Sequence, residues 1–335
     1  MKDKLVSTII VTYNSSKWIE NCLNSLINQQ TRFKQQIIIV DNGSKDETIN
    51  IIKEKFLSYV TLILSTNLGF GAGNNLGVQK AQGEYLFFVN PDTISQPNCL
   101  DNIITPLLKE DIVTTPKITI LNDEEKINTC GNLIHFTGFG FVNLFKNPST
   151  AFTKNFKVPA ISGAAFAMRK ATFNRLGGFD KDFFLYMEDS ELSWRICKDN
   201  VDIHCIATTS VAHEYELKLS AQKIMFLEQG RLMIIRKHYT KWQQILILPS
   251  LLIALLFSLF MSIRFGVCGF KYWCKAIIKG TFCKLSSKSI NYKHNINSEI
   301  PFFMFSSNIL VLFVGRILNI LFKLNFLIMK FFSNG

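Results

Sequence analysis

Short apolar runs alternate with amphipathic stretches along the first half of the chain, and this alternation predicts its secondary structure. Val6 to Thr12 is a β-branched run, and the apolar positions from Trp18 to Ile27 then recur at helical spacing. The same order of strand and helix returns with Gln36 to Val40, and a third strand is predicted at Val60 to Leu64. Strands that alternate with helices predict an α/β fold built on a doubly wound, mostly parallel sheet.

The fourth apolar run leads directly into polar residues that are suited to chemistry. Leu86 to Val89 predicts a buried strand that ends at Asn90-Pro91-Asp92. Ligands of open α/β sheets bind beyond the carboxyl ends of such strands, so we expect Asp92 to lie in a binding site. The alternative is a simple turn, because Asn, Pro and Asp all favour turns.

A glycine-rich segment lies between the third strand and this central strand. Its Gly71, Gly73 and Gly77 lack the GxGxxG spacing of a dinucleotide fingerprint and follow the third strand, not the first. A nicotinamide-binding domain is therefore disfavoured. We expect a loop in which glycine permits unusual backbone angles and the close approach of a phosphate, followed by a short helix to Gln82.

The charge is divided unevenly between two parts of the chain. Residues 1–215 carry 21 Lys and Arg against 22 Asp and Glu, whereas residues 216–335 carry 16 against 3, and the total is +12. The eight cysteines form no CxxC pair, which favours reduced thiols in a cytosolic compartment over a disulfide framework or a zinc site. We predict a first domain at 1–215 and a helical second domain at 216–335.

Several motifs resemble a known enzyme family. The chain resembles the nucleotide-binding half of an inverting, GT-A-fold glycosyltransferase of family 2 in VSTIIVTYNSSKWIENCLNSL, IIIVDNGSKDET and NLGFGAGNNLGVQKAQGEYLFFVNPD. It is most similar to the rhamnosyltransferase-like branch, which builds bacterial surface polysaccharides. Two later segments resemble the family's acceptor half, ISGAAFAMRKATFNRLGGFDKDFFLYMEDSELSWR and SVAHEYE. The resemblance therefore covers roughly residues 5 to 215.

The resemblance implies a nucleotide-sugar donor and a divalent cation that stabilises its departing diphosphate. It places the metal ligands at Asp92 and His213, and hard oxygen ligands favour Mg²⁺ or Mn²⁺. Asn90 stands where the family usually has an acid, and we expect it to touch ribose or a metal-bound water. The alternative for His213 is a structural role, which is the commoner one for a lone histidine.

The resemblance also implies contacts to the donor from other strand ends. Tyr13 matches a ring that stacks near the base, and Asp41 matches a carboxylate that hydrogen-bonds the base or ribose. Both follow strands, at the ligand-binding edge of the sheet. Asn67, Gly69 and Asn74 of the glycine-rich segment are expected in the same site. A turn aspartate and a half-buried core tyrosine are the structural alternatives.

A second acidic cluster, EDSELSWR, resembles the motif that holds the family's catalytic base. Inversion by a single displacement needs a carboxylate that takes the proton of the acceptor hydroxyl. Asp189 matches this base, and Glu188 is expected to orient the site or the acceptor. A structural role is the alternative, because Asp189 could cap the helix while Glu191 pairs with Arg195.

Two adjacent glycines, Gly177 and Gly178, precede the acidic cluster. In the family this segment forms a turn that closes over donor and acceptor. Two glycines would give such a loop freedom to move.

The basic second part contains long apolar stretches. Ile245 to Ile263 is a run of 19 uncharged residues, long enough to span a bilayer. One span would export the lysines that follow it, against the positive-inside rule, and a second span near 302–322 would not return them. A helical arrangement in the membrane surface removes this conflict, because basic residues share helical faces there and such helices bind anionic headgroups. These residues are Lys271, Lys275 and Lys279, and then Arg316, Lys323 and Lys330.

Two other interpretations of this second part are a globular helical domain that packs on the enzyme and a nucleic-acid-binding region. The apolar content argues against nucleic acid. We therefore expect an anionic membrane surface as a partner.

These patterns together predict a metal-dependent, inverting glycosyltransferase at the cytoplasmic face of the bacterial inner membrane. It would move a sugar from a nucleotide-diphosphate donor, dTDP-rhamnose or a UDP-sugar, to a lipid-linked glycan. A sugar nucleotidyltransferase is one alternative, but it would need a basic, glycine-rich phosphate loop after the first strand. A non-catalytic membrane-bound scaffold is the other, suggested by Asn90 and opposed by the joint presence of Asp92, Asp189 and His213.

Overall fold

The computed structural model describes residues 4–215, 219–286, 296–300 and 309–333. The chain divides into two compact units, one of residues 1–132 and 142–216 and one of residues 133–141 and 217–335. The sequence predicted a boundary after residue 215 but did not anticipate that residues 133–141 fold with the second unit.

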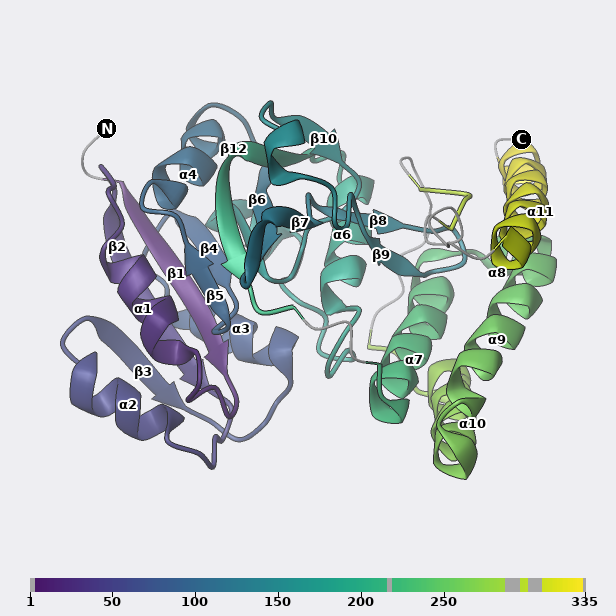
Figure 1. Ribbon diagram of the computed structural model, residues 1–335, viewed down its shortest axis with the longest axis horizontal. Coiled ribbons are helices and arrows are strands. Elements are labelled where there is room, and N and C mark those ends of the chain that lie inside the picture. The colour runs from purple at the N-terminus through teal and green to yellow at the C-terminus, as the bar shows by residue number, and fades with distance from the viewer. Residues whose placement is uncertain (1–3, 216–218, 287–295, 301–308, 334–335) are drawn as a thin grey trace. The chain divides into compact units, whose positions relative to one another are not determined.

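The described part of the first unit contains a mixed sheet of ten strands (Figure 1). Eight strands follow the order β10-β12-β6-β11-β4-β1-β2-β3, while β5 pairs with β12 and β7 pairs with β6. The strands are β1 (Leu5–Thr12), β2 (Lys34–Asp41), β3 (Val60–Leu64), β4 (Tyr85–Val89), β5 (Thr93–Ser95), β6 (Val113–Ile120), β7 (Asp123–Thr129), β10 (Phe156–Val158), β11 (Ala165–Arg169) and β12 (Ile203–His213). A separate hairpin of β8 (Asn132–Ile134) and β9 (Gly140–Val142) contains residues 133–141, which belong to the second unit.

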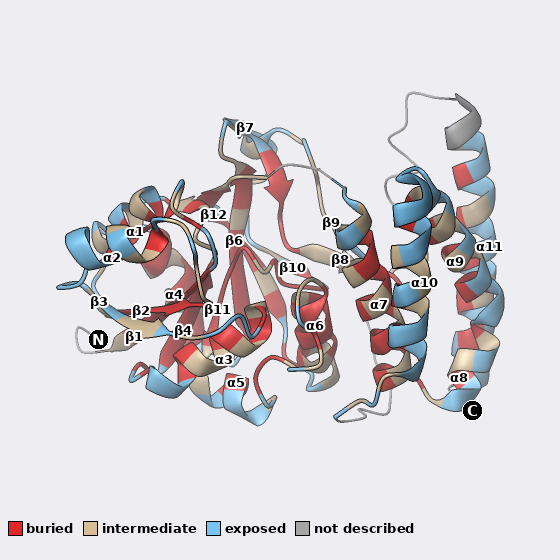
Figure 2. Cartoon of the chain, turned by 90° about the horizontal axis from the view of Figure 1, so that it is seen from below, coloured by how far each residue is buried: buried red, intermediate tan, exposed pale blue. Residues whose placement is uncertain are grey.

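Helices cover both faces of the sheet, so the predicted doubly wound α/β fold is confirmed. Ile10 of β1 lies in a core cluster with residues of α1 and α4, whereas its neighbour Ile9 lies in a second cluster with residues of α3, α5 and α6. Side chains alternate across a strand, which is why one strand serves both cores. Figure 2 shows the strands of this sheet coloured largely as buried. The helices are α1 (Ile19–Ile27), α2 (Thr48–Lys55), α3 (Phe70–Lys80), α4 (Cys99–Lys109), α5 (Lys170–Arg175) and α6 (Glu188–Lys198).

The glycine-rich segment forms most of α3, not the loop that we predicted. A Cβ atom on Gly73 would lie 2.9 Å from Val11 Cγ1, and one on Gly77 would lie 2.6 Å from Ile9 Cγ2. These glycines therefore let the helix approach β1 closely. Glycine costs about 1 kcal/mol relative to alanine in a helix, and the packing on the sheet offsets this cost.

The parallel strands β3, β2, β1 and β4 match the predicted alternation, and an antiparallel strand then extends the sheet. β11 pairs antiparallel with both β4 and β6, and β6 runs parallel to β12. At the end of β12, His213 pairs with Thr93 of β5. This pairing brings His213 beside the segment that follows β4.

The described part of the second unit is largely helical. Its helices are α7 (Ala221–His238), α8 (Lys241–Leu246), α9 (Leu248–Ile263), α10 (Gly266–Phe282) and α11 (Ile309–Ser333). Residue 247 interrupts the uncharged run, with Pro249 in the first turn of the following helix. No described helix is both long enough and apolar enough to cross a membrane. Part of the second predicted span, residues 301–308, lies outside the described residues.

The inserted residues 133–141 are held in the second unit by buried polar contacts. Arg231 is fully buried, donates to the carbonyl of Thr137 at 2.9 Å and pairs with Glu228. The hydroxyl of Tyr239 donates to the carbonyl of Phe136 at 2.8 Å. These bonds satisfy backbone carbonyls that would otherwise be buried without a partner.

Candidate active site

Asp92, just beyond the end of β4, lies beside His213, the last residue of β12. His213 Nε2 is 3.4 Å from Asp92 Oδ1. The backbone fixes this arrangement, because Glu214 N–H donates to Asp92 O at 3.0 Å and His213 is in register with Thr93. The structure therefore brings together the two residues predicted as metal ligands.

The other nitrogen of His213 faces an asparagine on β7. His213 Nδ1 lies 3.3 Å from Asn128 Oδ1. A proton on Nδ1 is donated to this amide oxygen, and Nε2 then presents its lone pair toward Asp92. Such an outer partner commonly fixes the tautomer of a metal-binding histidine.

Two buried oxygen atoms beside this pair are without a hydrogen-bond partner, namely Asn90 Oδ1 and Asp92 Oδ1. An unpaired buried acceptor costs about 1–3 kcal/mol, and a cation would satisfy it. Carboxylate and amide oxygens together with an imidazole nitrogen suit Mg²⁺ or Mn²⁺. The described residues include no group of three or more His, Cys, Asp and Glu arranged to hold a metal ion, so further ligands would have to come from the donor or water.

Asp41 holds its own loop in the structure. Its carboxylate is fully buried and accepts from Thr12 Oγ1 at 2.8 Å and Ser44 Oγ at 2.5 Å. The backbone N–H groups of Gly43 and Ser44 donate to its other oxygen. Direct contact between Asp41 and the donor stays a prediction. Tyr13, the residue after β1, is 49% exposed and its ring is free to stack on a ligand.

The three residues predicted in the glycine-rich segment have different surroundings in the structure. Asn67 is exposed, and its Oδ1 accepts from Gly69 N–H at 3.1 Å. Gly69 has a φ of +88°, and the carbonyl oxygen of Phe184 occupies the place of a Cβ atom on it. Asn74 is fully buried and donates to the carbonyl of Phe70 within its own helix. The side chain of Asn74 thus bonds within its own helix, and its contact with the donor stays a prediction.

Asp189 is half-buried in the first turn of α6 and receives hydrogen bonds on both carboxylate oxygens. Oδ2 accepts from Gly163 N–H at 3.1 Å and from Asn132 Nδ2 at 3.4 Å, while Oδ1 accepts from Ser190 N–H at 2.7 Å. The N-cap of α6 is Met187, not Asp189. The capping role that we considered for Asp189 is therefore not what the structure shows.

One peptide segment ties the acidic helix to the metal pair. Gly163 donates to Asp189, and the next residue, Ala164, accepts from the N–H of Asn90 at 2.9 Å. Asp189 and the backbone of Asn90 are therefore hydrogen-bonded to two consecutive residues just before β11. This link connects the candidate base to the segment that carries the candidate metal ligand Asp92.

Glu188 and Asp189 are neighbouring carboxyl groups, the first buried and the second half-buried. Burial, and then the charge of Asp189, raises the pKa of Glu188 to about 8. Burial also raises the pKa of Asp189, but N–H groups of Gly163 and Ser190 act in the opposite direction. Near neutral pH, Glu188 therefore holds a proton, while the hydrogen bonds to Asp189 favour its charged form.

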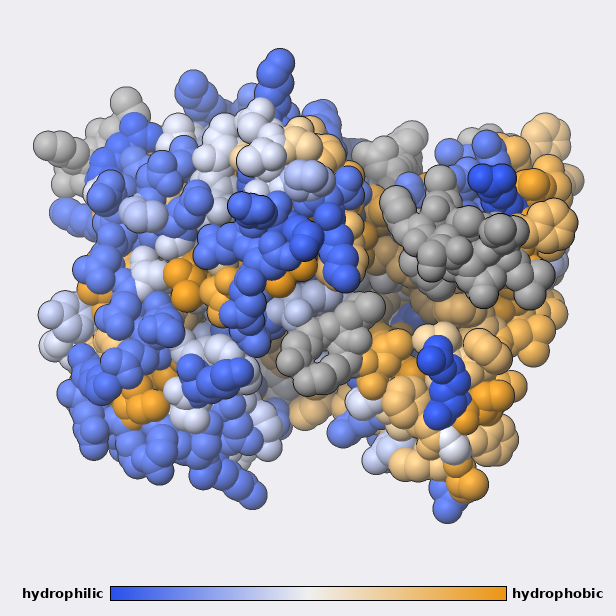
Figure 3. Space-filling view, in the orientation of Figure 1, coloured by the Kyte–Doolittle hydropathy of each residue, from blue (hydrophilic) through white to orange (hydrophobic). Residues whose placement is uncertain are grey.

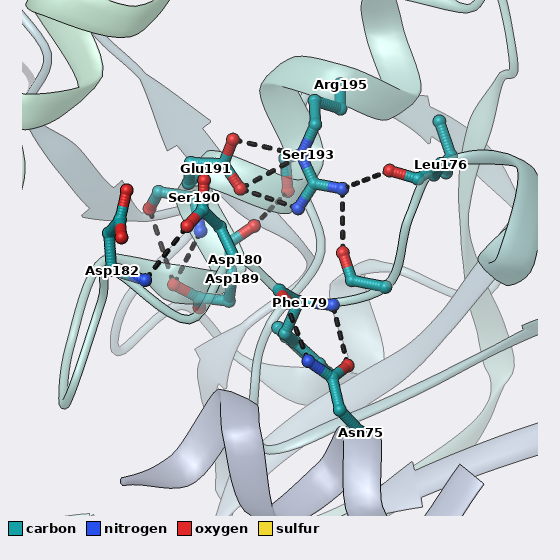
Figure 4. Close-up of polar contacts among 11 residues, drawn as sticks. Asn75, Leu176, Phe179, Asp180, Asp182, Asp189, Ser190, Glu191, Ser193 and Arg195 are labelled. Atoms are coloured by element: carbon teal, nitrogen blue, oxygen red, sulfur yellow. Dashed lines mark hydrogen bonds and ion pairs between the residues drawn. The ribbon is translucent and has the colours of Figure 1, made fainter. Parts of the chain in front are cut away.

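Arg195 anchors the turn that precedes the acidic cluster (Figure 4). Its Nη1 donates to the carbonyls of Leu176 at 2.6 Å and Gly178 at 2.7 Å. Its Nε and Nη2 pair with Glu191, whose side chain is almost fully buried. The guanidinium therefore binds the turn on one side and its own helix on the other.

The two glycines of this turn adopt backbone conformations that favour glycine, and the mobility of the loop stays a prediction. Gly177 and Gly178 have φ values of +83° and +70°. A Cβ atom on Gly178 would lie 2.6 Å from Asn75 Oδ1, whose amide is bonded to Phe179. Glycine is needed here for backbone conformation and close approach.

Three amides support the candidate site and were not predicted from the sequence, namely Asn75, Asn128 and Asn132. Asn75 lies within a recognised motif, whereas Asn128 and Asn132 lie outside all of them, and each contacts a residue that is distant in the chain. Only the pairing of β7 with β6 and the position of β8 bring two of them near the site.

Comparison with known proteins settles the family. Residues 7–177 match the model of glycosyl transferase family 2. The chain belongs to this family. The match favours the glycosyltransferase over the nucleotidyltransferase that we considered as an alternative.

Similar sequences include several bacterial glycosyltransferases. The chain is 34% identical over 113 residues to an uncharacterized glycosyltransferase of Haemophilus influenzae, covering 33% of this chain and 35% of that protein. It is 32% identical over 136 residues to the chondroitin synthase of Escherichia coli, covering 39% and 18%. It is 24% identical over 233 residues to the O-antigen biosynthesis protein RfbC of Myxococcus xanthus, covering 65% and 18%. The matches thus span about a third or less of the length of these relatives.

Solved structures show that the glycosyltransferase has a GT-A-like fold. GalNAc-T7 with UDP, GalNAc and Mn²⁺ aligns with a TM-score of 0.61 at 16% identity, covering 81% of this chain and 56% of that one. TarS 1-349 of S. aureus aligns with a TM-score of 0.52 at 20% identity, covering 82% and 79%. The same protein in complex with UDP-GlcNAc gives a TM-score of 0.51 at 18% identity, covering 82% and 80%.

Proposed function

We propose that this glycosyltransferase transfers a sugar from a nucleotide-diphosphate donor to a growing cell-surface glycan, with inversion and with the aid of a divalent cation. The observation that carries the proposal is the pair of hydrogen bonds made by the consecutive residues Gly163 and Ala164. It joins Asp189, a half-buried carboxylate, to the segment that holds Asp92 and His213. A base and a candidate cation site in one place are what a single displacement at a sugar diphosphate needs.

Asp92 and His213 would hold Mg²⁺ or Mn²⁺, with Asn90 beside them. The bound cation supplies positive charge that stabilises the departing diphosphate. Asn128 keeps the Nε2 lone pair of His213 available through its contact with Nδ1. GalNAc-T7, a structural neighbour, was solved with UDP and Mn²⁺, and this supports the same class of cofactor here.

Asp189 would act as the base. It would take the proton of the acceptor hydroxyl as that oxygen forms a bond to C1 of the donor sugar. The bond from C1 to the diphosphate breaks in the same step, and the nucleoside diphosphate leaves with the electron pair. The protonated state of Glu188 keeps the negative charge on Asp189, where the proton is needed.

The donor is proposed to be a UDP-sugar or dTDP-rhamnose, bound with its base near Tyr13. TarS was solved with UDP-GlcNAc, which supports a UDP-sugar. RfbC is named for O-antigen biosynthesis, which supports a surface polysaccharide as the product. A rhamnosyl donor rests only on the resemblance of the sequence motifs.

We place the reaction at the cytoplasmic face of the bacterial inner membrane, with a lipid-linked glycan as acceptor. Nucleotide sugars are made in the cytosol, and the described cysteines are free thiols, as expected for a reducing compartment. A non-catalytic scaffold is the competing idea, and it predicts no turnover with any donor.

A donor screen tests this function. The purified chain is incubated with UDP-glucose, UDP-galactose, UDP-GlcNAc or dTDP-rhamnose, and release of the nucleoside diphosphate is measured with Mn²⁺ and with chelator. We expect turnover of one donor, lost in chelator, and about 10²–10⁴-fold slower in Asp189→Asn with nucleotide binding retained. Asp202→Asn, on an exposed pair with Lys157, is the matched control. Turnover that is unaffected by chelator and by Asp189→Asn would contradict the proposal.

A further inference from the structure

Helix α9 of the second unit has the opposite pattern to a helix that faces water. Its serines Ser250, Ser258 and Ser262 are buried, whereas Leu256 and Phe260 are 67% and 60% exposed. A surface helix of a water-soluble domain buries its apolar residues and exposes its polar ones. The buried serines show that the apolar side of this helix is turned outward.

The interior of this helical unit includes polar side chains among its apolar ones. Trp273 Nε1 of α10 donates to Ser258 Oγ of α9 at 2.9 Å. Asn319 of α11 is buried, and its amide bonds the N–H and the carbonyl of Ile300 at 2.8 and 3.4 Å. Small and polar residues between helices, with apolar side chains outside, are typical of helices that pack in lipid.

Exposed large apolar side chains are concentrated in this unit. Among the described residues, the second unit has twenty-three and the larger first unit has six. On α11, Phe313, Leu324 and Phe331 are each more than half exposed. Figure 3 shows apolar side chains gathered over the helices of the second unit on the face in view. Soluble monomers rarely expose apolar surface on this scale.

Basic residues border the same surface. Between residues 241 and 333 the sequence has eleven basic residues and one acidic residue, Glu299. Lys271, Lys275 and Lys279 are exposed along α10, and Arg316, Lys323 and Lys330 are exposed along α11 at intervals of seven residues. A seven-residue interval keeps these side chains on one side of a helix, next to its exposed apolar side.

We propose that helices α9, α10 and α11 form a docking surface for an anionic lipid bilayer, in which they lie in the headgroup region instead of crossing the membrane. The apolar side chains enter the acyl boundary, and the lysines and arginines contact acidic headgroups. This deepens the membrane location proposed above. It does not depend on catalysis, because its readout is binding to lipid.

A lipid surface fits better than a protein partner for two reasons. The exposed apolar residues extend over three helices, and the unit carries a strong excess of positive charge. A second copy of the chain would bring the same positive charge to the contact, whereas an anionic bilayer complements it.

Vesicle flotation tests this proposal. The full chain, purified in detergent, is reconstituted with vesicles of phosphatidylcholine alone or with about one third phosphatidylglycerol, a strongly anionic mixture. We expect flotation with both, and tighter binding to the anionic vesicles. Leu256→Ser with Phe260→Ser should weaken binding to both by about tenfold. The triple variant Lys271→Gln, Lys275→Gln and Lys279→Gln should weaken binding only to anionic vesicles, again by about tenfold or more.

Matched controls come from the first unit. Leu57→Ser with Leu64→Ser changes two leucines of similar exposure, and Gln at Lys53, Lys80 and Lys154 removes three exposed charges. Neither control should change flotation. The proposal is overturned if the wild-type chain does not float, if the controls act like the test variants, or if Leu256→Ser with Phe260→Ser splits a stable dimer without changing lipid binding.

Protease added outside sealed proteoliposomes separates surface docking from a span. Removal of an N-terminal tag by the protease identifies the molecules that face outward. In all of these molecules we expect trypsin to cut the segment from Lys271 to Lys284. Protection of this segment in those molecules would overturn the in-plane arrangement.

Discussion

Asn75 and Phe179 are joined by two hydrogen bonds that run in opposite directions. Asn75 Nδ2 donates to Phe179 O at 2.8 Å, and Phe179 N–H donates to Asn75 Oδ1 at 2.9 Å. Asn75 lies within α3, and Phe179 lies in the turn before α6. The pair therefore fixes α3 relative to the segment that leads to Asp189.

Replacement of Asn75 should loosen this turn. Asn75→Leu leaves the N–H and C=O of Phe179 without their partners, at a cost of about 1–3 kcal/mol. Asn75→Asp keeps one bond and should act more weakly. We expect faster hydrogen exchange at Phe179 and about tenfold lower kcat/KM, mainly through kcat, because the base is misplaced. Asn50→Ala, on the exposed surface of α2, is the control. Unchanged exchange at Phe179 in Asn75→Leu would contradict the role.

The two glycines of the same turn should differ in their tolerance of alanine. Gly177 has open space around its Cβ position, so Gly177→Ala meets only the penalty of a positive φ, about 1–2 kcal/mol. Gly178→Ala meets the same penalty and a contact of 2.6 Å with Asn75 Oδ1. Pulse proteolysis in urea should therefore show a greater loss of stability for Gly178→Ala. Equal losses would mean that Asn75 moves aside at little cost.

Metal affinity should depend on Asn128 as well as on the ligands. Asn128→Leu removes the acceptor of His213 Nδ1 and should weaken Mn²⁺ binding by about 10- to 100-fold, whereas Asp92→Asn or His213→Ala should weaken it more. Free Mn²⁺ is measured by electron paramagnetic resonance in the presence of UDP. Asp123→Asn, on an exposed ion pair, is the control. Normal binding in Asp92→Asn would place the cation elsewhere.

The sequence predicted the α/β fold because its strands are short apolar runs followed by amphipathic helices, a local pattern. The prediction of a loop at α3 was wrong, because Gly73 and Gly77 are typical of loops. Only the three-dimensional structure shows that these glycines allow close packing against Val11 and Ile9. The antiparallel strand β11 was also missed, since its pairing with β4 and β6 is a tertiary choice.

For the site, motifs identified the residues that carry charge, and the structure brings Asp92 to His213 as expected. The motifs did not identify Asn128 or Asn132, because an amide that supports a distant side chain leaves no local pattern. The burial of Asn74 was not predictable for a related reason: its motif is recognisable, but the direction of its side chain is set by the packing of α3 on the sheet.

Glu188 should make both stability and turnover depend on pH near 8. Its pKa in the folded chain is about 8, against an ordinary 4.5, because of burial and the charge of Asp189. The folded state therefore holds a proton that the unfolded chain has released between these values. This stabilising contribution is complete below about pH 4.5, declines as pH rises to about 8, and is constant above that.

Glu188→Gln removes this titration without changing the shape of the side chain. The stability of the variant relative to wild type should rise with pH across this window, by at most about 1.4 kcal/mol for each pH unit. Urea unfolding by pulse proteolysis at pH 5, 6.5 and 8 measures the difference. Wild-type kcat/KM should also change near pH 8 as a second charge appears beside Asp189, and this change should be absent in the variant. A difference in stability that does not vary with pH would show that Glu188 is ionised in the folded chain at all three values.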